Sequence, residues 1–184
     1  IKDHETINKD KSFNVVIEIP SGTSEKWEVS KLNGSIVREF YMGKPRDIEF
    51  GPYPVNYGIL PRTVLPISRG GDGDPLDIFV LGSPLTRGEV VKVRPIGVVK
   101  MNDTGDQDDK IIAVHSKSEF NQINNIEHLN SQHPEILKNI KYWFENYKGK
   151  NVVEFVNFGS AIEAKELIEL SRNYYKRLGV KPRS

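Results

Sequence analysis

Three carboxylates lie close together in the sequence GGDGDPLDIF, which spans residues 70–79. Asp72 and Asp74 are two residues apart, so an extended backbone would point both side chains to the same side, and Asp77 follows where a strand is expected to begin. Carboxylates held this close repel one another unless water solvates them or hard cations bind their oxygens. Because Asp and Gly are also common turn residues, the segment by itself fits a solvated turn as well as a metal site.

A second acid-rich turn, NDTGDQDDK, spans residues 102–110 and contains four further aspartates, among them Asp103 and Asp108. It lies between two segments rich in β-branched residues, 89–101 and 111–114, which we predict to be strands. Two acidic turns at the ends of neighbouring strands can face each other across the mouth of a curled sheet. The sequence therefore predicts a site for more than one cation.

Basic and aromatic side chains accompany these carboxylates on short β-type segments. The sequence KWEVSK alternates, so Lys26 and Glu28 are expected to project on the same side, and Glu18 is a charged residue on a largely apolar strand. The Asn33-Gly34 turn predicts a hairpin whose returning strand carries Arg38. Cations beside carboxylates indicate an anionic substrate, such as a phosphate ester or anhydride bridged by Mg²⁺ and attacked by water.

Other generic motifs do not fit the sequence. An EF-hand loop that begins at Asp72 would need glutamate at its twelfth position, where the chain has Ser83. The sequence contains no Gly-rich nucleotide loop and no nucleophile elbow, and its four histidines lack metal-ligand spacing. Because there is no cysteine, the expected ligands are oxygens, which favour Mg²⁺, Mn²⁺ or Ca²⁺ over zinc or copper.

The elements that must position these residues change type along the chain. We predict strands over residues 13–19, 26–31, 35–40, 76–81, 89–101 and 111–114, with Val15, Ile17 and Ile19 on one face of the first and a bend at Pro95 in the fifth. Residues 41–66 contain so many prolines that we expect a long, structured loop there.

From about Ser118 the apolar period becomes helical. We predict a helix over residues 134–147, and a last helix that begins with a capping box at Ser160 and Glu163 and whose inward residues extend to Leu178. Strands followed by helices indicate an α+β fold, a β-barrel or curled sheet with helices packed on it, mainly in the C-terminal part.

Bulk properties narrow the classes of function. The 184 residues fit a single domain, which we place at 13–184 after a loose polar leader over 1–12. A net charge of +1 removes the usual electrostatic argument for a nucleic-acid or anionic-membrane partner. No apolar run approaches the about 20 residues that span a bilayer. The chain begins at Ile1 rather than Met, which leaves open a removed signal peptide or a trimmed N-terminus.

Several motifs, taken in order, resemble those of the soluble family I inorganic pyrophosphatases, and particularly the bacterial type. The matching segments are IEIPSG (17–22), KWEV (26–29), YPVNYG (53–58), GDGDPLD (71–77), RPIGVVKMND (94–103), GDQDDK (105–110) and ENYK (145–148). The resemblance implies a five-stranded OB-like β-barrel with flanking helices. It also implies a cytoplasmic homo-oligomer, with a hexamer favoured, that hydrolyses pyrophosphate to two orthophosphates with several Mg²⁺ ions and so drives biosynthetic reactions that release pyrophosphate.

The resemblance further implies a role for each site residue. Asp74 matches the general base toward a nucleophilic water bridged by metal ions. The implied metal residues are Asp72, Asp77, Asp103 and Asp108, with Glu18 and Glu28 as outer carboxylates, and the implied phosphate-binding residues are Lys26, Arg38, Tyr57, Lys110, Tyr147 and Lys148.

The segment around Arg38 departs from the usual bacterial pattern. The hairpin from Glu28 to Arg38 is shorter, and the segment from Arg38 to Tyr53 is several residues longer. Arg46 is therefore an alternative to Arg38 as the arginine that binds phosphate.

Two other functions stay open at this point. One is an OB-type binding module without catalysis, which would need an exposed aromatic and basic groove rather than an acidic one. The other is a Mg²⁺-dependent phosphatase for organic esters, which shares the chemistry and differs only in substrate.

Overall fold

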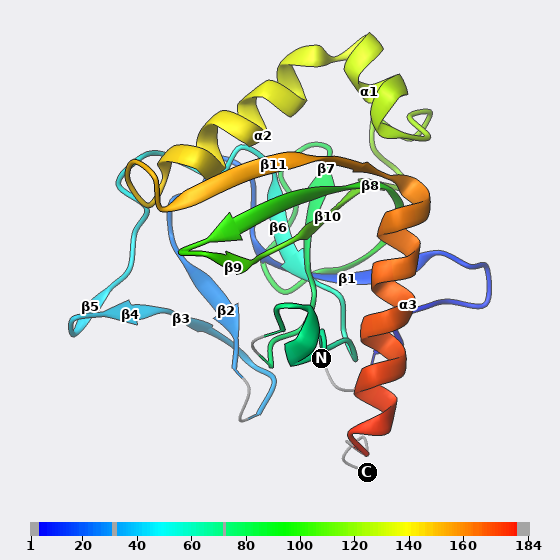
Figure 1. The fold of residues 1–184 in the computed structure, drawn as a ribbon, viewed down its shortest axis with the longest axis horizontal. Coiled ribbons are helices and arrows are strands. Elements are labelled where there is room, and N and C mark those ends of the chain that lie inside the picture. Colours follow the sequence, from blue (N-terminus) through cyan, green and yellow to red (C-terminus); the bar gives the residue numbers. More distant parts are fainter. Residues whose placement is uncertain (1–3, 31–32, 72, 180–184) are drawn as a thin grey trace.

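The computed structural model describes residues 4–30, 33–71 and 73–179. A seven-stranded sheet forms its centre (Figure 1). The sheet runs in the order β1 (Phe13–Ile19), β6 (Asn56–Ile59), β7 (Asp77–Leu81), β10 (Lys110–His115), β8 (Val90–Asp103) and β11 (Val153–Ser160), and β9 (Asp106–Gln107) pairs with β8. The fold is therefore a mixed sheet with helices, in agreement with the predicted α+β class.

The sheet curls strongly. Strand β1 pairs with β6 along one edge and with β8 along the other, so the pairings β1–β6–β7–β10–β8 return to their starting strand. Strands β7 and β10 are parallel, and the other pairs are antiparallel. Such a cycle brings the ends of strands that are distant in sequence to one mouth.

Two apolar clusters occupy the two faces of the sheet. Successive side chains of a strand point to opposite faces, so Ile78 belongs to one cluster and its neighbour Phe79 to the other. Helix α2 (Pro134–Asn146) buries Trp143 and Phe144 in the cluster of Phe79, and α3 (Ala161–Arg177) buries Ile168 in the cluster of Ile78. Figure 1 shows α2 lying along β11, with α3 beside the opposite end of the sheet.

The first strand has the predicted bounds but not the predicted face. A register shift between Ile17 and Ile19 marks a β-bulge, and it places Ile19 in a different cluster from Val15 and Ile17. Because β1 has neighbours on both edges and packing on both faces, Val16 and Glu18 are buried as well.

Two hairpins extend from the sheet at its left side in Figure 1. The predicted hairpin is present as β2 (Trp27–Val29) paired with β3 (Ile36–Arg38), and β4 (Phe40–Tyr41) pairs with β5 (Lys44–Pro45). A short 3-10 helix, Ile67–Arg69, precedes the first acidic turn.

The predicted loop over residues 41–66 is wrong in one important respect, because it contains the buried strand β6. Its prolines flank this strand at Pro54 and Pro61 and leave the amides between them free to pair. Strand β11 and helix α1 (Ile126–Gln132) were not predicted, because the apolar residues of β11 do not alternate strictly and α1 has only two of them in seven residues.

The two predicted helices are confirmed, and so is the capping box of α3. Ser160 Oγ accepts a hydrogen bond from the Glu163 amide, and the Glu163 carboxylate accepts one from the Ser160 amide. The inward face is shorter than expected, because Leu178 at its end is half exposed. Within the described ranges, none of the helices combines the length and apolarity needed to cross a membrane.

The described part of the polar leader is attached to the sheet rather than loose. Thr6 is buried and donates to the carbonyl of Pro61 at 2.7 Å, while its own carbonyl accepts from the Asn14 amide at 3.0 Å. Ile7 forms a β-bridge with Phe13, which attaches this segment to the start of β1.

Candidate active site

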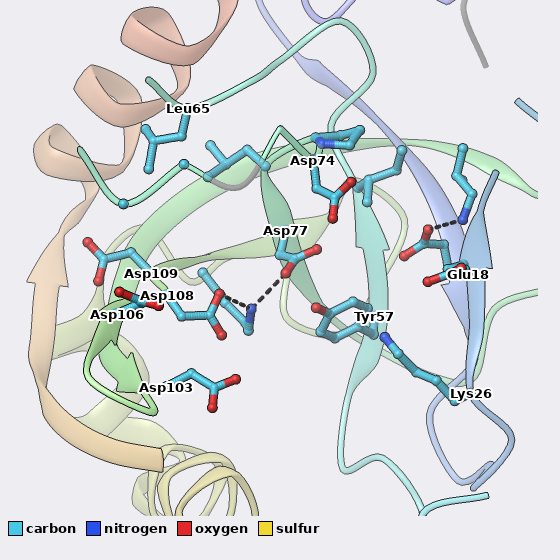
Figure 2. Close-up of a pocket in the computed structure, with 18 of the residues that line it drawn as sticks. Glu18, Lys26, Tyr57, Leu65, Asp74, Asp77, Asp103, Asp106, Asp108 and Asp109 are labelled. Carbon is cyan, nitrogen blue, oxygen red and sulfur yellow. Dashed lines mark hydrogen bonds and ion pairs between the residues drawn. The ribbon is translucent and has the colours of Figure 1, made fainter. Parts of the chain in front are cut away.

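A cavity of about 860 Å³ opens where β1, β2, β6 and β7 meet the acidic turn between β8 and β10 and the C-terminal end of α2 (Figure 2). Both acidic turns face this cavity, one through Asp74 and Asp77 and the other through Asp103 and Asp108. Of the predicted site residues that the structure describes, all except Arg38 line it. Asp72 lies outside the described residues.

The centre of the cavity is a buried ion-pair network around Lys110. Its Nζ lies 2.6 Å from Asp77 Oδ2 and 2.8 Å from Asp108 Oδ1, drawn as dashed lines in Figure 2. The parallel register of β7 and β10 explains the contact, since Ile78 pairs with Ile111 and the preceding residues of the two strands are then neighbours. Strand pairing thus brings Asp77 to Lys110, which lies 33 positions later in the chain and two positions after Asp108.

These ion pairs determine the charge states. Burial by itself would raise the pKa of Asp77, but Lys110 beside it holds that pKa below its ordinary value. Burial by itself would lower the pKa of Lys110, yet the two carboxylates raise it above its ordinary value. Lys148, just after α2, forms a second pair with Asp103 at the end of β8. Both lysines are therefore ammonium ions at neutral pH.

Glu18 and Lys26 lie on the right side of the cavity in Figure 2, and Glu28 also lines the cavity. Glu18 is buried at the end of β1 and accepts a hydrogen bond from the Val29 amide at 2.6 Å, which ties the β2–β3 hairpin to the sheet. Burial raises the pKa of Glu18 to about 8, with Asp77 adding to the shift and Lys26 opposing it.

Tyrosine hydroxyls supply neutral hydrogen-bond donors. Tyr57 is buried between Phe79 and the cavity, and the Nζ of Lys26 lies 5.0 Å from its ring centroid. Tyr147 stacks on Trp143 with ring centroids 4.6 Å apart. Burial raises the pKa of both tyrosines above the ordinary value, so both hydroxyls keep their protons.

The two candidate arginines lie in different surroundings. Arg38 pairs with Asp47 and, at 3.2 Å, with Glu25, and it lies over the ring of Trp27 outside the cavity. Arg46 lines the cavity and pairs with Glu39. The structure therefore brings Arg46, and not Arg38, to the other site residues.

Further polar residues of the cavity were not assigned a role from the sequence. Asp106, Gln107 and Asp109 belong to the second acidic turn, and Asp109 accepts from Gln107 Nε2 at 2.7 Å. Their position in an acid-rich turn was the only signal that could have found them.

Gly71, at the first acidic turn, must stay small, since a Cβ there would lie 1.8 Å from the Leu65 carbonyl oxygen.

The donor set of the cavity suits hard cations and phosphate together. Carboxylate oxygens are the ligands that Mg²⁺ prefers, while ammonium, guanidinium and hydroxyl groups suit phosphate oxygens. Across the described ranges, however, no three acidic or histidine side chains converge as a ready set of metal ligands. In their place, Lys110 and Lys148 neutralise the carboxylates.

A protein-family model matches most of this chain. The description of the matching family is "Inorganic pyrophosphatase", and the match covers residues 15–176. An inorganic pyrophosphatase of Xylella fastidiosa is 36% identical over 174 residues, which are 92% of each chain. One from Gluconobacter oxydans is 40% identical over 141 residues, covering 74% of this chain and 73% of that protein.

Solved structures show the same likeness. The inorganic pyrophosphatase of Schistosoma japonicum superposes with a TM-score of 0.87 at 27% identity, covering 96% of this chain and 70% of the other. The enzyme of Helicobacter pylori gives a TM-score of 0.80 at 29% identity, with 95% and 99% covered. The likeness thus extends over nearly the whole length of the chain.

Proposed function

Because the chain belongs to the inorganic pyrophosphatase family, we propose that it hydrolyses pyrophosphate to two orthophosphates with Mg²⁺ as its cofactor. The observation that carries this proposal is the joint presence of carboxylates, ammonium groups and tyrosine hydroxyls on the walls of one cavity. A groove for nucleic acid would be basic, whereas among the described residues of this cavity eight carboxylates outnumber four basic side chains.

The oxygen donors fit Mg²⁺. Asp77, Asp103 and Asp108 face the cavity, and together with Asp72 they would hold the metal ions, with Glu18 and Glu28 as outer carboxylates that bind coordinated waters. When bound, Mg²⁺ supplies charge neutralisation for the phosphates and a lowered pKa for water. Asp74, at the cavity wall three residues before Asp77, is the proposed base that accepts the proton of the attacking water.

The cationic and hydroxyl groups would hold the substrate. Lys26, Tyr57, Lys110, Tyr147 and Lys148 can each donate to phosphate oxygens, and charge-assisted hydrogen bonds of this kind stabilise the charge that develops on the leaving phosphate. We assign the arginine of this set to Arg46 in place of Arg38, because Arg38 is held outside the cavity by Glu25 and Asp47.

The proposal also includes the fold, the assembly and the cellular location that the family resemblance implies. The cycle of strand pairings supports an OB-like barrel of five strands. We also propose a single domain over residues 13–184, a cytoplasmic homo-oligomer with a hexamer favoured, and a role in driving biosynthetic reactions that release pyrophosphate.

The test is phosphate release from pyrophosphate, measured with Mg²⁺ and with excess chelator, beside a nucleoside triphosphate and a sugar phosphate. We expect turnover of pyrophosphate only with Mg²⁺, and little turnover with Ca²⁺, which is larger and tolerates irregular coordination. Equal turnover of the organic phosphates would favour the phosphatase alternative. Full activity in excess chelator would refute the metal requirement.

A further inference from the structure

The pairing of β6 with β7 changes at the end nearest the first acidic turn. Ile59 pairs with Asp77, and in the same antiparallel register Leu60 lies opposite Leu76. The Leu60 amide donates to the Leu76 carbonyl at 3.0 Å, as in a regular ladder. The return bond is not direct, because the Leu76 amide donates at 2.9 Å to Thr63 Oγ1, and this hydroxyl donates at 2.6 Å to the Leu60 carbonyl. A threonine hydroxyl is thus inserted into the ladder.

The inserted hydroxyl marks the point where the two backbones separate. In a regular antiparallel pair the amide would bond the opposite carbonyl directly, whereas here an oxygen atom lies between them. Asp77 stays on the paired side of this point, opposite Ile59. Asp74 lies two residues before Leu76, on the separated side, and lines the cavity. The direction in which the chain leaves the sheet therefore determines where Asp74 lies relative to Asp77.

The inserted hydroxyl is itself held firmly. Thr63 is completely buried, and its single hydroxyl proton is used on the Leu60 carbonyl. The residues beside it are attached to other elements, since the Pro61 carbonyl accepts from Thr6 Oγ1 at 2.7 Å and the Val64 amide donates to a carbonyl of α3 at 3.2 Å. Thr63 does not line the cavity, so it can act on the chemistry only through the backbone of Leu76.

We propose that Thr63 is a positioning residue that sets the place of Asp74 relative to Asp77, an inference that rests on the proposed function of these two carboxylates. Its effect falls on turnover more than on substrate binding. A displaced base takes up the proton of water less efficiently, while the lysines and tyrosines that would hold the phosphates are on other elements and stay in place.

The test is steady-state hydrolysis of pyrophosphate by Thr63→Val, which keeps the branched shape and removes the hydroxyl. We expect kcat to fall by roughly 10- to 100-fold and KM to change by less than about threefold, because a small misplacement of a reacting group costs rate rather than affinity. Higher pH should recover part of the loss, since water then ionises with less help from the base. Thr63→Ser, which keeps the hydroxyl, should retain most of the wild-type kcat.

The matched control is Thr6→Val. Thr6 is also a buried threonine, and it donates to the Pro61 carbonyl in the same loop without bonding Leu76. Both valine variants should melt at a lower temperature, because each leaves buried backbone groups without a partner. Only Thr63→Val should lose turnover. An equal loss of kcat in the two variants would show a general loosening of the loop and would overturn the proposal.

A double variant tests whether Thr63 acts through Asp74. If it does, adding Thr63→Val to Asp74→Asn should lower kcat little further, because the base whose place it sets is already absent. If the two losses multiply instead, Thr63 acts on another group and the proposal is wrong.

Thr63→Cys decides the question if Thr63→Val does not fold. Its thiol can still donate and accept weakly, but the longer C–S bond should displace the Leu76 amide. We expect its kcat to fall below that of Thr63→Ser, which lacks the same methyl group. Equal kcat values in the cysteine and serine variants would overturn the proposal.

Hydrogen exchange over residues 73–79, measured by mass spectrometry without substrate, separates this inference from the proposed function. Exchange should be faster in Thr63→Val, or in Thr63→Cys if the valine variant does not fold, than in Thr6→Val, because the Leu76 amide has lost its acceptor or bonds it more weakly. That result in a chain that does not hydrolyse pyrophosphate would refute the proposed function and support the placement by Thr63. Hydrolysis with an unchanged kcat in Thr63→Val would refute the positioning role alone.

Discussion

Asp74 and Asp77 lie on one short segment but should have different roles. Asp77 is fixed by Lys110 in the ion-pair network, whereas Asp74 lines the cavity in the turn before β7. We expect Asp74→Asn to lower turnover by about 10²- to 10⁴-fold, the usual effect of losing a general base, with nearly unchanged Mg²⁺ affinity. Asp77→Asn should mainly weaken metal binding, so its turnover should recover in part when the Mg²⁺ concentration is raised.

The measurement is turnover as a function of Mg²⁺ concentration and pH for both variants. Higher pH should partly restore Asp74→Asn, because water then ionises without a base. If high Mg²⁺ restores Asp74→Asn and leaves Asp77→Asn inactive, the two roles are reversed.

The raised pKa of Glu18 predicts that the free energy of unfolding falls as the pH rises. Burial raises its pKa to about 8 in the folded chain, so the folded state holds a proton that the unfolded state has already released. Its contribution to the free energy of unfolding is therefore complete below the ordinary glutamate pKa and is lost as the pH rises toward 8. We expect a loss of up to about 5 kcal/mol from this group.

Urea unfolding in the presence of a chelator, at pH 5 and pH 8.5, measures this effect. Glu18→Gln keeps an oxygen for the Val29 amide and cannot ionise, so it should be the more stable protein at the higher pH. If the free energy of unfolding falls by the same amount in the wild type and in Glu18→Gln, another group is responsible.

The hairpins decide which arginine reaches the cavity. Glu25 accepts from Trp27 Nε1 at 2.9 Å and pairs with both Arg38 and Arg87, and Arg87 Nε donates to the carbonyl of Glu18 at 3.2 Å. These contacts attach the β2–β3 hairpin to β1 from outside the cavity. Arg38 is therefore a positioning residue of the hairpin that carries Lys26 and Glu28.

Substitution of the two arginines separates these roles. Arg46→Met should lower kcat/KM for pyrophosphate by roughly tenfold or more, since a charged hydrogen bond to phosphate contributes about 1.5–3 kcal/mol. Arg38→Met should lower the melting temperature and change kcat/KM less. Steady-state kinetics and thermal melting of both variants provide the comparison, and a larger kinetic loss in Arg38→Met would contradict the assignment.

The assembly prediction concerns the outer surface. Phe40, Tyr41 and Met42 form the tip of the β4–β5 hairpin and are 61%, 63% and 86% exposed. Contiguous exposed apolar side chains are typical of contact surfaces. Together with the family resemblance, this supports a homo-oligomer with closed symmetry.

Light scattering at micromolar concentration should accordingly give a mass several times the 20.9 kDa of one chain, with a hexamer as the expected species. Tyr41→Asp, which places a charge on the exposed tip, should leave the fold intact and weaken any contact made there. A mass of one chain for the wild type would refute the assembly prediction.

The sequence by itself determined the elements whose signals are local. The β-branched run of β1, the apolar period of α2 and the capping box of α3 depend on residues a few positions apart, and all three elements are found with nearly the predicted bounds. The residue types of the site were equally readable, because clustered aspartates in turns indicate hard cations whatever surrounds them.

Only the tertiary structure decided which of these residues meet. Strand β6 has a weak local signal and exists because β1 and β7 pair with its two edges. Arg46 lines the cavity, whereas Arg38 is held outside it by Asp47 and Glu25. Lys110 reaches Asp77 through the parallel register of β7 and β10, a contact between residues 33 positions apart. Such contacts depend on how the strands assemble, and no local pattern in the chain encodes that assembly.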